Sequence, residues 1–222
     1  MRQDDVEAGC GLRQRNTLDS LRLHDAGVMS RRITIIDGHP DPDSARLCHA
    51  LADAYAAGAQ KAGHQIHRID LSDLDFSHLV SRGEWEGAPP TGDIAEVQGA
   101  IAWANHVVVI HPLWLGAMPG RLKCLLEQVL RPDFAFNPAQ KGMGGGRLKG
   151  RSARIIVTMG MPALIYDLFF FAHSTRSFRR NILEFVGMKP VRTLIIGGVE
   201  GRGEKDGARW LAQVERLGEQ AI

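Results

Sequence analysis

Short runs of β-branched residues alternate with longer amphipathic segments along this chain from residue 33 onward. The run at 33–37, ITIID, ends at Gly38, and the run at 106–110, HVVVI, is apolar enough for a strand that is buried on both faces. Because strands that alternate with helices are joined by crossover connections, the pattern predicts a parallel sheet with helices on both faces. We expect a single α/β domain over residues 31–222.

Five strands and five main helices are expected along this domain. The strands are predicted at residues 33–37, 65–71, 106–110, 153–158 and 191–196, and the helices at 44–62, 93–103, 119–130, 176–186 and 204–217. Ser44 is the predicted N-cap of the first helix, and the Gly- and Pro-rich segments 72–92 and 131–150 are predicted as loops. Five such strands match a doubly wound sheet of order 2-1-3-4-5, which binds ligands outside the carboxyl ends of its strands.

Composition excludes several other classes of protein. The formal net charge is only +2, with 27 basic and 25 acidic residues, so nothing favours a dedicated nucleic-acid or membrane-surface binder. Cys10, Cys48 and Cys124 lie far apart without disulfide or metal-ligand spacing, which predicts reduced thiols, a cytoplasmic location and no metal site. The densest apolar stretch, residues 164–172, is too short to span a membrane, so no stable membrane insertion is expected.

Residues 1–30 differ from the rest of the chain. They are polar, mix acidic and basic side chains, and lack both a sustained apolar period and the apolar core of a signal peptide. Two interpretations stay open: a loosely ordered N-terminal extension, or sequence upstream of a start at Met29. We assign no function to this segment.

The segment after the first predicted strand, GHPDPDSAR at 38–46, has the residues of an anion site. The following helix would present free amides and its positive dipole end, and His39, Ser44 and Arg46 would add donors. A phosphate is the natural ligand, provided that Asp41 and Asp43 face solvent. An ordinary proline-rich turn with a capping serine is an equally good interpretation of this segment alone.

Two further segments follow strands at the same predicted edge. The segment at 111–120, HPLWLGAMPG, offers backbone groups to the edge of a heterocycle and an apolar wall to its face. The segment at 158–162, TMGMP, contains a glycine that permits close approach of a ligand, and Tyr166 and His173 beyond it could donate protons. Packing of these side chains in the core or on the surface is the competing interpretation.

With these segments in order, the chain resembles the flavodoxin-like NAD(P)H:quinone oxidoreductases, the flavodoxin-2 group that includes DT-diaphorase-like and modulator-of-drug-activity-B-like reductases. The similarity runs from Ile33 to Gly201. Its most specific part is HPLWLGAMPGRLKCLLEQVL, residues 111–130, followed by the aromatic-Ala-aromatic segment at 134–136. The turn at 39–44 and LKGRSARIIVTMG at 148–160 add to it.

The resemblance implies a role for each segment. The residues that would surround the flavin phosphates are His39, Ser44, Ala45 and Arg46. The residues that would hold the isoalloxazine through backbone contacts are Pro112, Leu113, Trp114 and Leu115. The residues that would close the pyrimidine side of the ring are Thr158, Met159 and Gly160. Tyr166 would act in the nicotinamide and acceptor pocket, with His173 as a proton relay. Gln98 matches a position near the adenine of FAD-binding members, which favours FAD over FMN.

The implied activity is ping-pong two-electron hydride transfer from NAD(P)H, through the flavin, to a quinone-like acceptor. The family also implies a homodimer whose pocket is completed by the second subunit. The alternatives are a flavin-bound regulatory subunit of an ion-transport system, an azo- or nitro-reductase, and an electron carrier, although the +2 balance counts against the last. Ala45, Met161 and the placement of Trp114 depart from the family pattern and leave the acceptor open.

Overall fold

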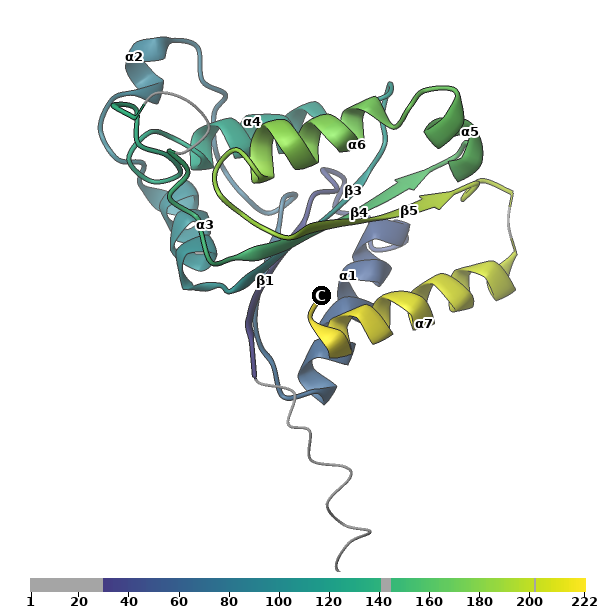
Figure 1. Cartoon of the computed structure of the whole chain (residues 1–222). Coiled ribbons are helices and arrows are strands. Elements are labelled where there is room, and N and C mark those ends of the chain that lie inside the picture. The colour runs from purple at the N-terminus through teal and green to yellow at the C-terminus, as the bar shows by residue number, and fades with distance from the viewer. Residues whose placement is uncertain (1–29, 141–144, 202) are drawn as a thin grey trace, which may run out of the picture.

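The computed structural model describes residues 30–140, 145–201 and 203–222, so the extension expected over residues 1–30 lies, but for Ser30, outside them. The chain forms a five-stranded sheet in which every neighbouring pair is parallel, in the order β2-β1-β3-β4-β5 (Figure 1). The strands are β1 (Arg32–Asp37), β2 (Gln65–Asp70), β3 (His106–Pro112), β4 (Ser152–Met159) and β5 (Val191–Gly197). The predicted α/β class and the 2-1-3-4-5 order are therefore confirmed.

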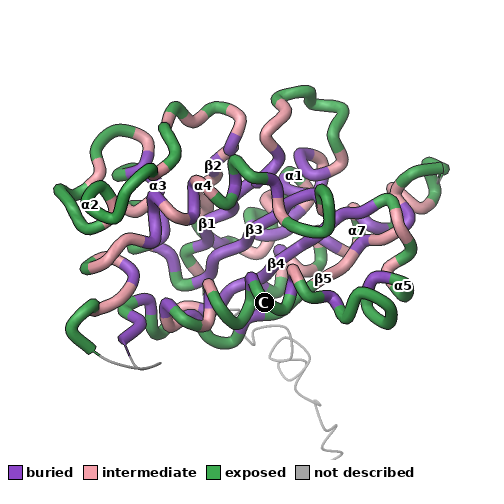
Figure 2. The backbone as a smooth tube through the Cα atoms, turned by 90° about the horizontal axis from the view of Figure 1, so that it is seen from above, coloured by how far each residue is buried: buried purple, intermediate pink, exposed green. Residues whose placement is uncertain are grey.

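Helices cover both faces of the sheet, as predicted (Figure 1). The helices are α1 (Leu47–Lys61), α2 (Arg82–Trp85), α3 (Gly92–Trp103), α4 (Gly120–Val129), α5 (Ala163–Leu168), α6 (His173–Ser177), the π-helix η1 (Phe178–Leu183) and α7 (Glu204–Gln220). Two of them, α1 and α7, pack together on one face, while α3, α4, α6 and η1 lie on the other. Since β3 and β4 are buried along their whole length, the core runs through the middle of the molecule (Figure 2).

The helix predicted at 44–62 begins three residues late. Asp41 accepts a hydrogen bond from the amide of Asp43, and Asp43 accepts one from the amide of Ala45, each at 3.0 Å. These bonds hold residues 41–46 as turns, so α1 starts at Leu47 with Arg46 as its N-cap. The predicted capping role of Ser44 is therefore wrong.

The helix predicted at 176–186 is replaced by α6 and η1, in which the amide of Glu184 reaches back five residues to the carbonyl of Arg179. Two short helices, α2 and α5, were not predicted, and α2 lies inside the segment expected to be a loop. Within the described residues, no helix combines the length and the apolar character that crossing a membrane requires.

Candidate functional site

The three loops singled out in the sequence meet at the carboxyl edge of the sheet. They follow β1, β3 and β4, which are neighbours in the order of strands. The amide of Gly38 donates to the carbonyl of Ile110 at 2.7 Å, and the amide of Leu113 donates to the carbonyl of Thr158 at 2.7 Å. A Cβ at position 38 would lie 2.7 Å from Cδ2 of Leu122 and 3.0 Å from the carbonyl oxygen of Ile110, so any other residue would force these neighbours to shift.

The first loop carries its own carboxylates beside the predicted donors. Arg46 forms ion pairs with Asp41 at 2.8 Å and with Asp43 at 3.3 Å, and Asp43 also holds the amide of Ala45. Asp41 and Asp43 are partly exposed, with side-chain exposures of 38% and 50%, but they turn toward Arg46 as well as toward solvent. Ser44 is exposed in the same turn.

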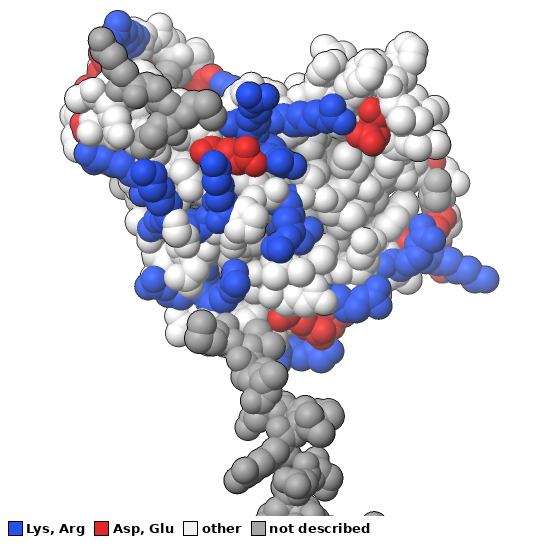
Figure 3. Space-filling view, in the orientation of Figure 1, with Lys and Arg blue, Asp and Glu red and all other residues white. Residues whose placement is uncertain are grey.

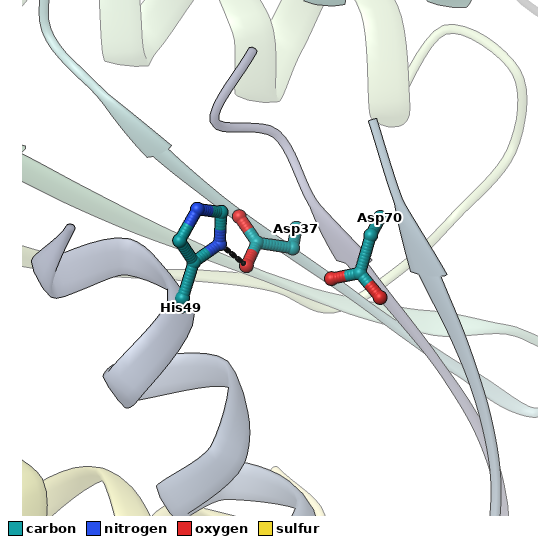
Figure 4. Close-up of side chains that lie close together, drawn as sticks. All are labelled: Asp37, His49 and Asp70. Carbon is teal, nitrogen blue, oxygen red and sulfur yellow. Dashed lines mark hydrogen bonds and ion pairs between the residues drawn. The ribbon is translucent and has the colours of Figure 1, made fainter. Parts of the chain in front are cut away.

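A buried pair formed by His49 and Asp37 supports this loop from inside the protein. The sequence alone did not indicate this pair. The Nδ1 of His49 lies 2.6 Å from the Oδ2 of Asp37 (Figure 4). Its Nε2 lies 2.9 Å from the carbonyl oxygen of Asp41. Because a carboxylate and a carbonyl can only accept, both contacts are hydrogen bonds when both ring nitrogens donate, and we therefore interpret His49 as an imidazolium. Burial acts to lower the pKa of His49, but these hydrogen bonds outweigh it and raise the pKa above its usual value.

Asp37, His49 and Asp70 also form the one group among the described residues whose ligand atoms lie close enough together to hold a metal ion. Figure 4 shows Asp37 between the other two. The guanidinium of Arg68, however, lies 2.9 Å from Asp70 and 3.3 Å from Asp37. Because Arg68 and His49 already supply positive charge to these carboxylates, we interpret the cluster as an ion-pair network that fixes the start of the first loop.

His39 links the first loop to the second. Its ring lies 5.5 Å from the ring of His49 and 5.6 Å from that of Trp114, edge to face in both cases. Burial lowers the pKa of His39. Its Nδ1 lies 3.2 Å from the amide nitrogen and 3.3 Å from the carbonyl oxygen of Asp41. In the tautomer whose Nδ1 accepts the amide proton, Nε2 carries the ring proton and can donate to a ligand.

The second loop is a strained two-residue turn. Trp114 and Ala117 exchange backbone hydrogen bonds of 2.8 and 2.9 Å, and both residues between them have positive φ angles, 49° at Leu115 and 78° at Gly116. Glycine accepts this conformation freely, whereas a leucine loses about 1–2 kcal/mol in it. Leu115 is fully exposed and Trp114 is half-exposed, so the turn presents an apolar surface with backbone polar groups beside it.

The third loop offers its backbone, because its first two side chains point into the core. Met159 is buried, and the hydroxyl of buried Thr158 lies 3.5 Å from the Sγ of Cys48. Gly160 is exposed, and a Cβ there would lie 2.8 Å from the carboxylate of Glu200. Glu200, which follows β5, was not singled out in the sequence because neighbouring strands bring it here.

Three other predicted residues differ in how free their side chains are. The hydroxyl of Tyr166 is buried against Thr175, 3.1 Å from its Oγ1 and 3.3 Å from its amide, so it joins α5 to α6 and is not free to protonate a ligand. His173 is exposed at the start of α6, with its ring 5.7 Å from that of Phe171. Gln98 donates to the carbonyl of Val129 at 2.8 Å between α3 and α4, so no contact there supports a role beside an adenine.

The other groups at the carboxyl edge of the sheet fit a phosphate and a flat aromatic group. No described side chain caps α1, whose first turn also lacks acidic residues, so its amino end keeps free amides for an anion. The neutral His39 adds a donor, and the turn at 114–117 adds an apolar face with a backbone edge. The two carboxylates of the first loop oppose an anion.

Comparison with known proteins identifies the family of this fold. Residues 31–220 match the model of the family Flavodoxin_2, described as a flavodoxin-like fold. The ribosyldihydronicotinamide dehydrogenase-like protein traD of Penicillium crustosum is 26% identical over 155 residues, which are 58% of this chain and 57% of that protein. The FMN-dependent NADH:quinone oxidoreductase 9 of Burkholderia lata is 24% identical over 192 residues, which are 74% of this chain and 86% of that protein.

The fold also matches the structure of the NAD(P)H:quinone oxidoreductase from Methanothermobacter marburgensis, with a TM-score of 0.72 and 23% identity over 86% of this chain and 95% of that one. The chain spans just over half the length of the Penicillium relative and most of the length of the Burkholderia relative. Since the family model matches residues 31–220, nearly the whole of the described chain, the protein belongs to the Flavodoxin_2 family of flavodoxin-like folds.

Proposed function

We propose that this protein is a flavin-dependent NAD(P)H oxidoreductase that reduces quinone-like acceptors by a ping-pong mechanism. The observation that carries the proposal is the convergence of three ligand-type loops at the carboxyl edge of β1, β3 and β4. Membership of the Flavodoxin_2 family and the quinone oxidoreductase relatives support the same activity. When bound, the flavin supplies the redox chemistry, because it accepts a hydride from NAD(P)H and gives two electrons to the acceptor.

In this proposal, each loop holds one part of the cofactor. The Nε2 of His39, the amides of Ser44 and Ala45 and the amino end of α1 bind the phosphate, helped by the side chains of Ser44 and Arg46. The backbone from Pro112 to Leu115 holds the ring, and Gly160 lets the third loop approach its pyrimidine side.

We propose FMN as the cofactor in place of the FAD expected from the sequence. That expectation depended on Gln98, whose amide is already bound to Val129 between two helices. A relative described as FMN-dependent supports the choice. The proton donor we propose is His173, which is exposed, whereas Tyr166 is bound to Thr175.

We further propose that the protein works as a homodimer. The surface over α5 exposes Leu164, Leu168, Phe169, Phe170 and Phe171, and this corner is almost free of charge in Figure 3. A second apolar surface is a groove of about 680 Å³ between residues 79–85, α4 and η1, where Phe136 lies 5.5 Å from both Trp85 and Phe185. A twofold pair could bury both surfaces at once, with the patch of each copy in the groove of the other.

An anaerobic titration tests the activity. The purified protein should show flavin absorbance that bleaches with NADPH or NADH and returns with a quinone, and chromatography of the released cofactor should identify FMN. Return with an azo or nitro compound but not with a quinone would favour the alternative acceptors. Flavin binding without turnover would favour the regulatory subunit of an ion-transport system, and failure to bind flavin would refute the proposal. The cytoplasmic location remains a prediction.

Light scattering after size exclusion tests the dimer. The substitution Phe169→Asp places a charge in the apolar patch and should give a monomer, because burying an unpaired carboxylate is strongly unfavourable. Ala57→Asp adds the same charge to the exposed side of α1, on the opposite face of the sheet, and should leave the dimer intact. A monomeric unmodified protein, or a dimer that survives Phe169→Asp, would exclude this arrangement.

A further inference from the structure

The connection between β1 and α1 contains one feature that attracts an anion and another that repels it. The amino end of α1 favours one, because its first turn has neither an acidic residue nor a described side-chain cap. The turn before it carries Asp41 and Asp43. With Arg46 as the cation among them and His39 neutral, residues 39–46 have a net negative charge beside the helix end.

Asp43 occupies the groups that the proposed function gives to the cofactor phosphate. Its Oδ1 accepts the amide of Ala45 at 3.0 Å, and its Oδ2 lies 3.3 Å from the Nη2 of Arg46. One carboxylate therefore holds a turn amide and the guanidinium together, as a phosphate oxygen pair would. The Asp43 side chain is half-exposed, so it can turn out to solvent without unpacking the core.

Asp41 has a different role, although it also contacts Arg46. Its carbonyl is held from below by His49 at 2.9 Å, and its carboxylate accepts the amide of Asp43 and the Nε and Nη2 of Arg46. Hydrogen bonds to Asp43 and Arg46 hold the pKa of Asp41 below its usual value. The Asp41 carboxylate contacts three donor groups and is 38% exposed, whereas the Asp43 carboxylate contacts two and is 50% exposed, so Asp43 is the acid of this turn that can move more easily.

We propose that the carboxylate of Asp43 occupies the place of the cofactor phosphate in the flavin-free protein, and that FMN must displace it from Ala45 and Arg46. This inference depends on the proposed function. Asp43 then determines specificity: it weakens binding of a phosphorylated flavin and leaves the binding of riboflavin, which has the same ring and no phosphate, unaffected. The turn therefore determines how much more tightly the protein binds FMN than riboflavin.

The test compares the dissociation constants of FMN and riboflavin, measured by quenching of flavin fluorescence. Asp43→Ala frees both the amide and Arg46, so it should strengthen FMN binding by about tenfold, the scale of one charge-assisted hydrogen bond. Riboflavin binding should not change. Asp43→Asn, whose side-chain oxygen can still accept from Ala45 but which releases Arg46, should give a smaller gain. Glu215→Gln on α7, which pairs with Lys61 at 3.8 Å at the far end of α1, removes the same charge and should change neither constant.

Other outcomes overturn the proposal in distinct ways. If Asp43 only shapes the turn, Asp43→Ala should weaken FMN binding and Asp43→Asn should leave it unchanged. An unchanged ratio of FMN to riboflavin affinity in both variants also refutes the inference, while FMN binding by the unmodified protein keeps the proposed function. If the unmodified protein binds neither flavin, the proposed function fails and this inference fails with it. Circular dichroism of each variant confirms that the fold is intact.

Discussion

The buried pair of Asp37 and His49 gives the strongest test of how this site is held in place. Asp37 is completely buried and accepts hydrogen bonds from the Nδ1 of His49, the amide of His39 and the Nη2 of Arg68. We expect Asp37→Asn to lower the free energy of unfolding by about 3 kcal/mol, because it leaves a buried imidazolium without its carboxylate. The asparagine side chain keeps the volume of the aspartate and one hydrogen-bond acceptor. The loss of stability therefore measures the removal of the negative charge and not the creation of a cavity.

The coupling between the two side chains can be worked out and measured. Unit charges about 4 Å apart attract by about 4 kcal/mol at an effective dielectric constant of 20, and desolvation of both groups offsets part of that. We expect about 2 kcal/mol of coupling from urea denaturation of the unmodified protein, Asp37→Asn, His49→Gln and the double variant near pH 6. A coupling below about 0.5 kcal/mol, the value of an exposed pair, would refute the assignment of His49 as a buried imidazolium.

The same pair predicts the direction of a pH effect. The pKa of His49 is raised in the folded protein, so its contribution to stability is complete below the unfolded pKa of about 6.5 and is lost as the pH rises through the folded value. The proton that leaves comes from Nε2, which frees the Asp41 carbonyl, while Nδ1 keeps its bond to Asp37. The stability difference between the unmodified protein and His49→Gln should therefore shrink as the pH rises above about 6.5. A constant difference would contradict this.

Three further substitutions test individual contacts. Leu115→Asn should raise the free energy of unfolding by about 1 kcal/mol, since asparagine tolerates the positive φ of 49°; denaturation showing no gain would remove the strain argument. Tyr166→Phe should lower stability by about 1 kcal/mol and leave NAD(P)H turnover unchanged, so a turnover loss of about tenfold would restore Tyr166 as a proton donor. Gly38→Val should lower stability by about 2 kcal/mol or more, because its Cβ would meet the backbone oxygen of Ile110 at 3.0 Å; an unchanged midpoint would disprove this clash.

The alternation of apolar runs and amphipathic segments determined the class of this fold and the positions of its strands. All five observed strands lie within two residues of the predicted ranges. The apolar runs of β1, β3 and β4 are typical of buried parallel strands, whereas the less buried β2 and β5 follow shorter apolar patterns. The carboxyl edge followed from the same pattern, since the end of each strand fixes where its loop begins. The sequence therefore predicts where the three loops lie but not which contacts they make.

Side-chain partners were decided by the tertiary structure. Ser44 and Arg46 were expected to bind a phosphate at the start of a helix, but hydrogen bonds from the amides of Asp43 and Ala45 to the Asp41 and Asp43 carboxylates delay the start of α1 to Leu47. Tyr166 and Gln98 matched site positions of the family, yet one binds Thr175 and the other the backbone of Val129.

His49 shows most clearly what cannot be predicted from the sequence alone. In sequence it is one polar residue in an alanine-rich helix, with no spacing that distinguishes it. Its charge comes from Asp37 at the end of β1 and from the Asp41 carbonyl, which reach it because β1 and α1 pack face to face. Local sequence determines which elements form, because backbone preference and apolar period are properties of neighbouring residues. The protonation and partners of a buried group depend on atoms that only the packing of distant segments brings within a few ångströms.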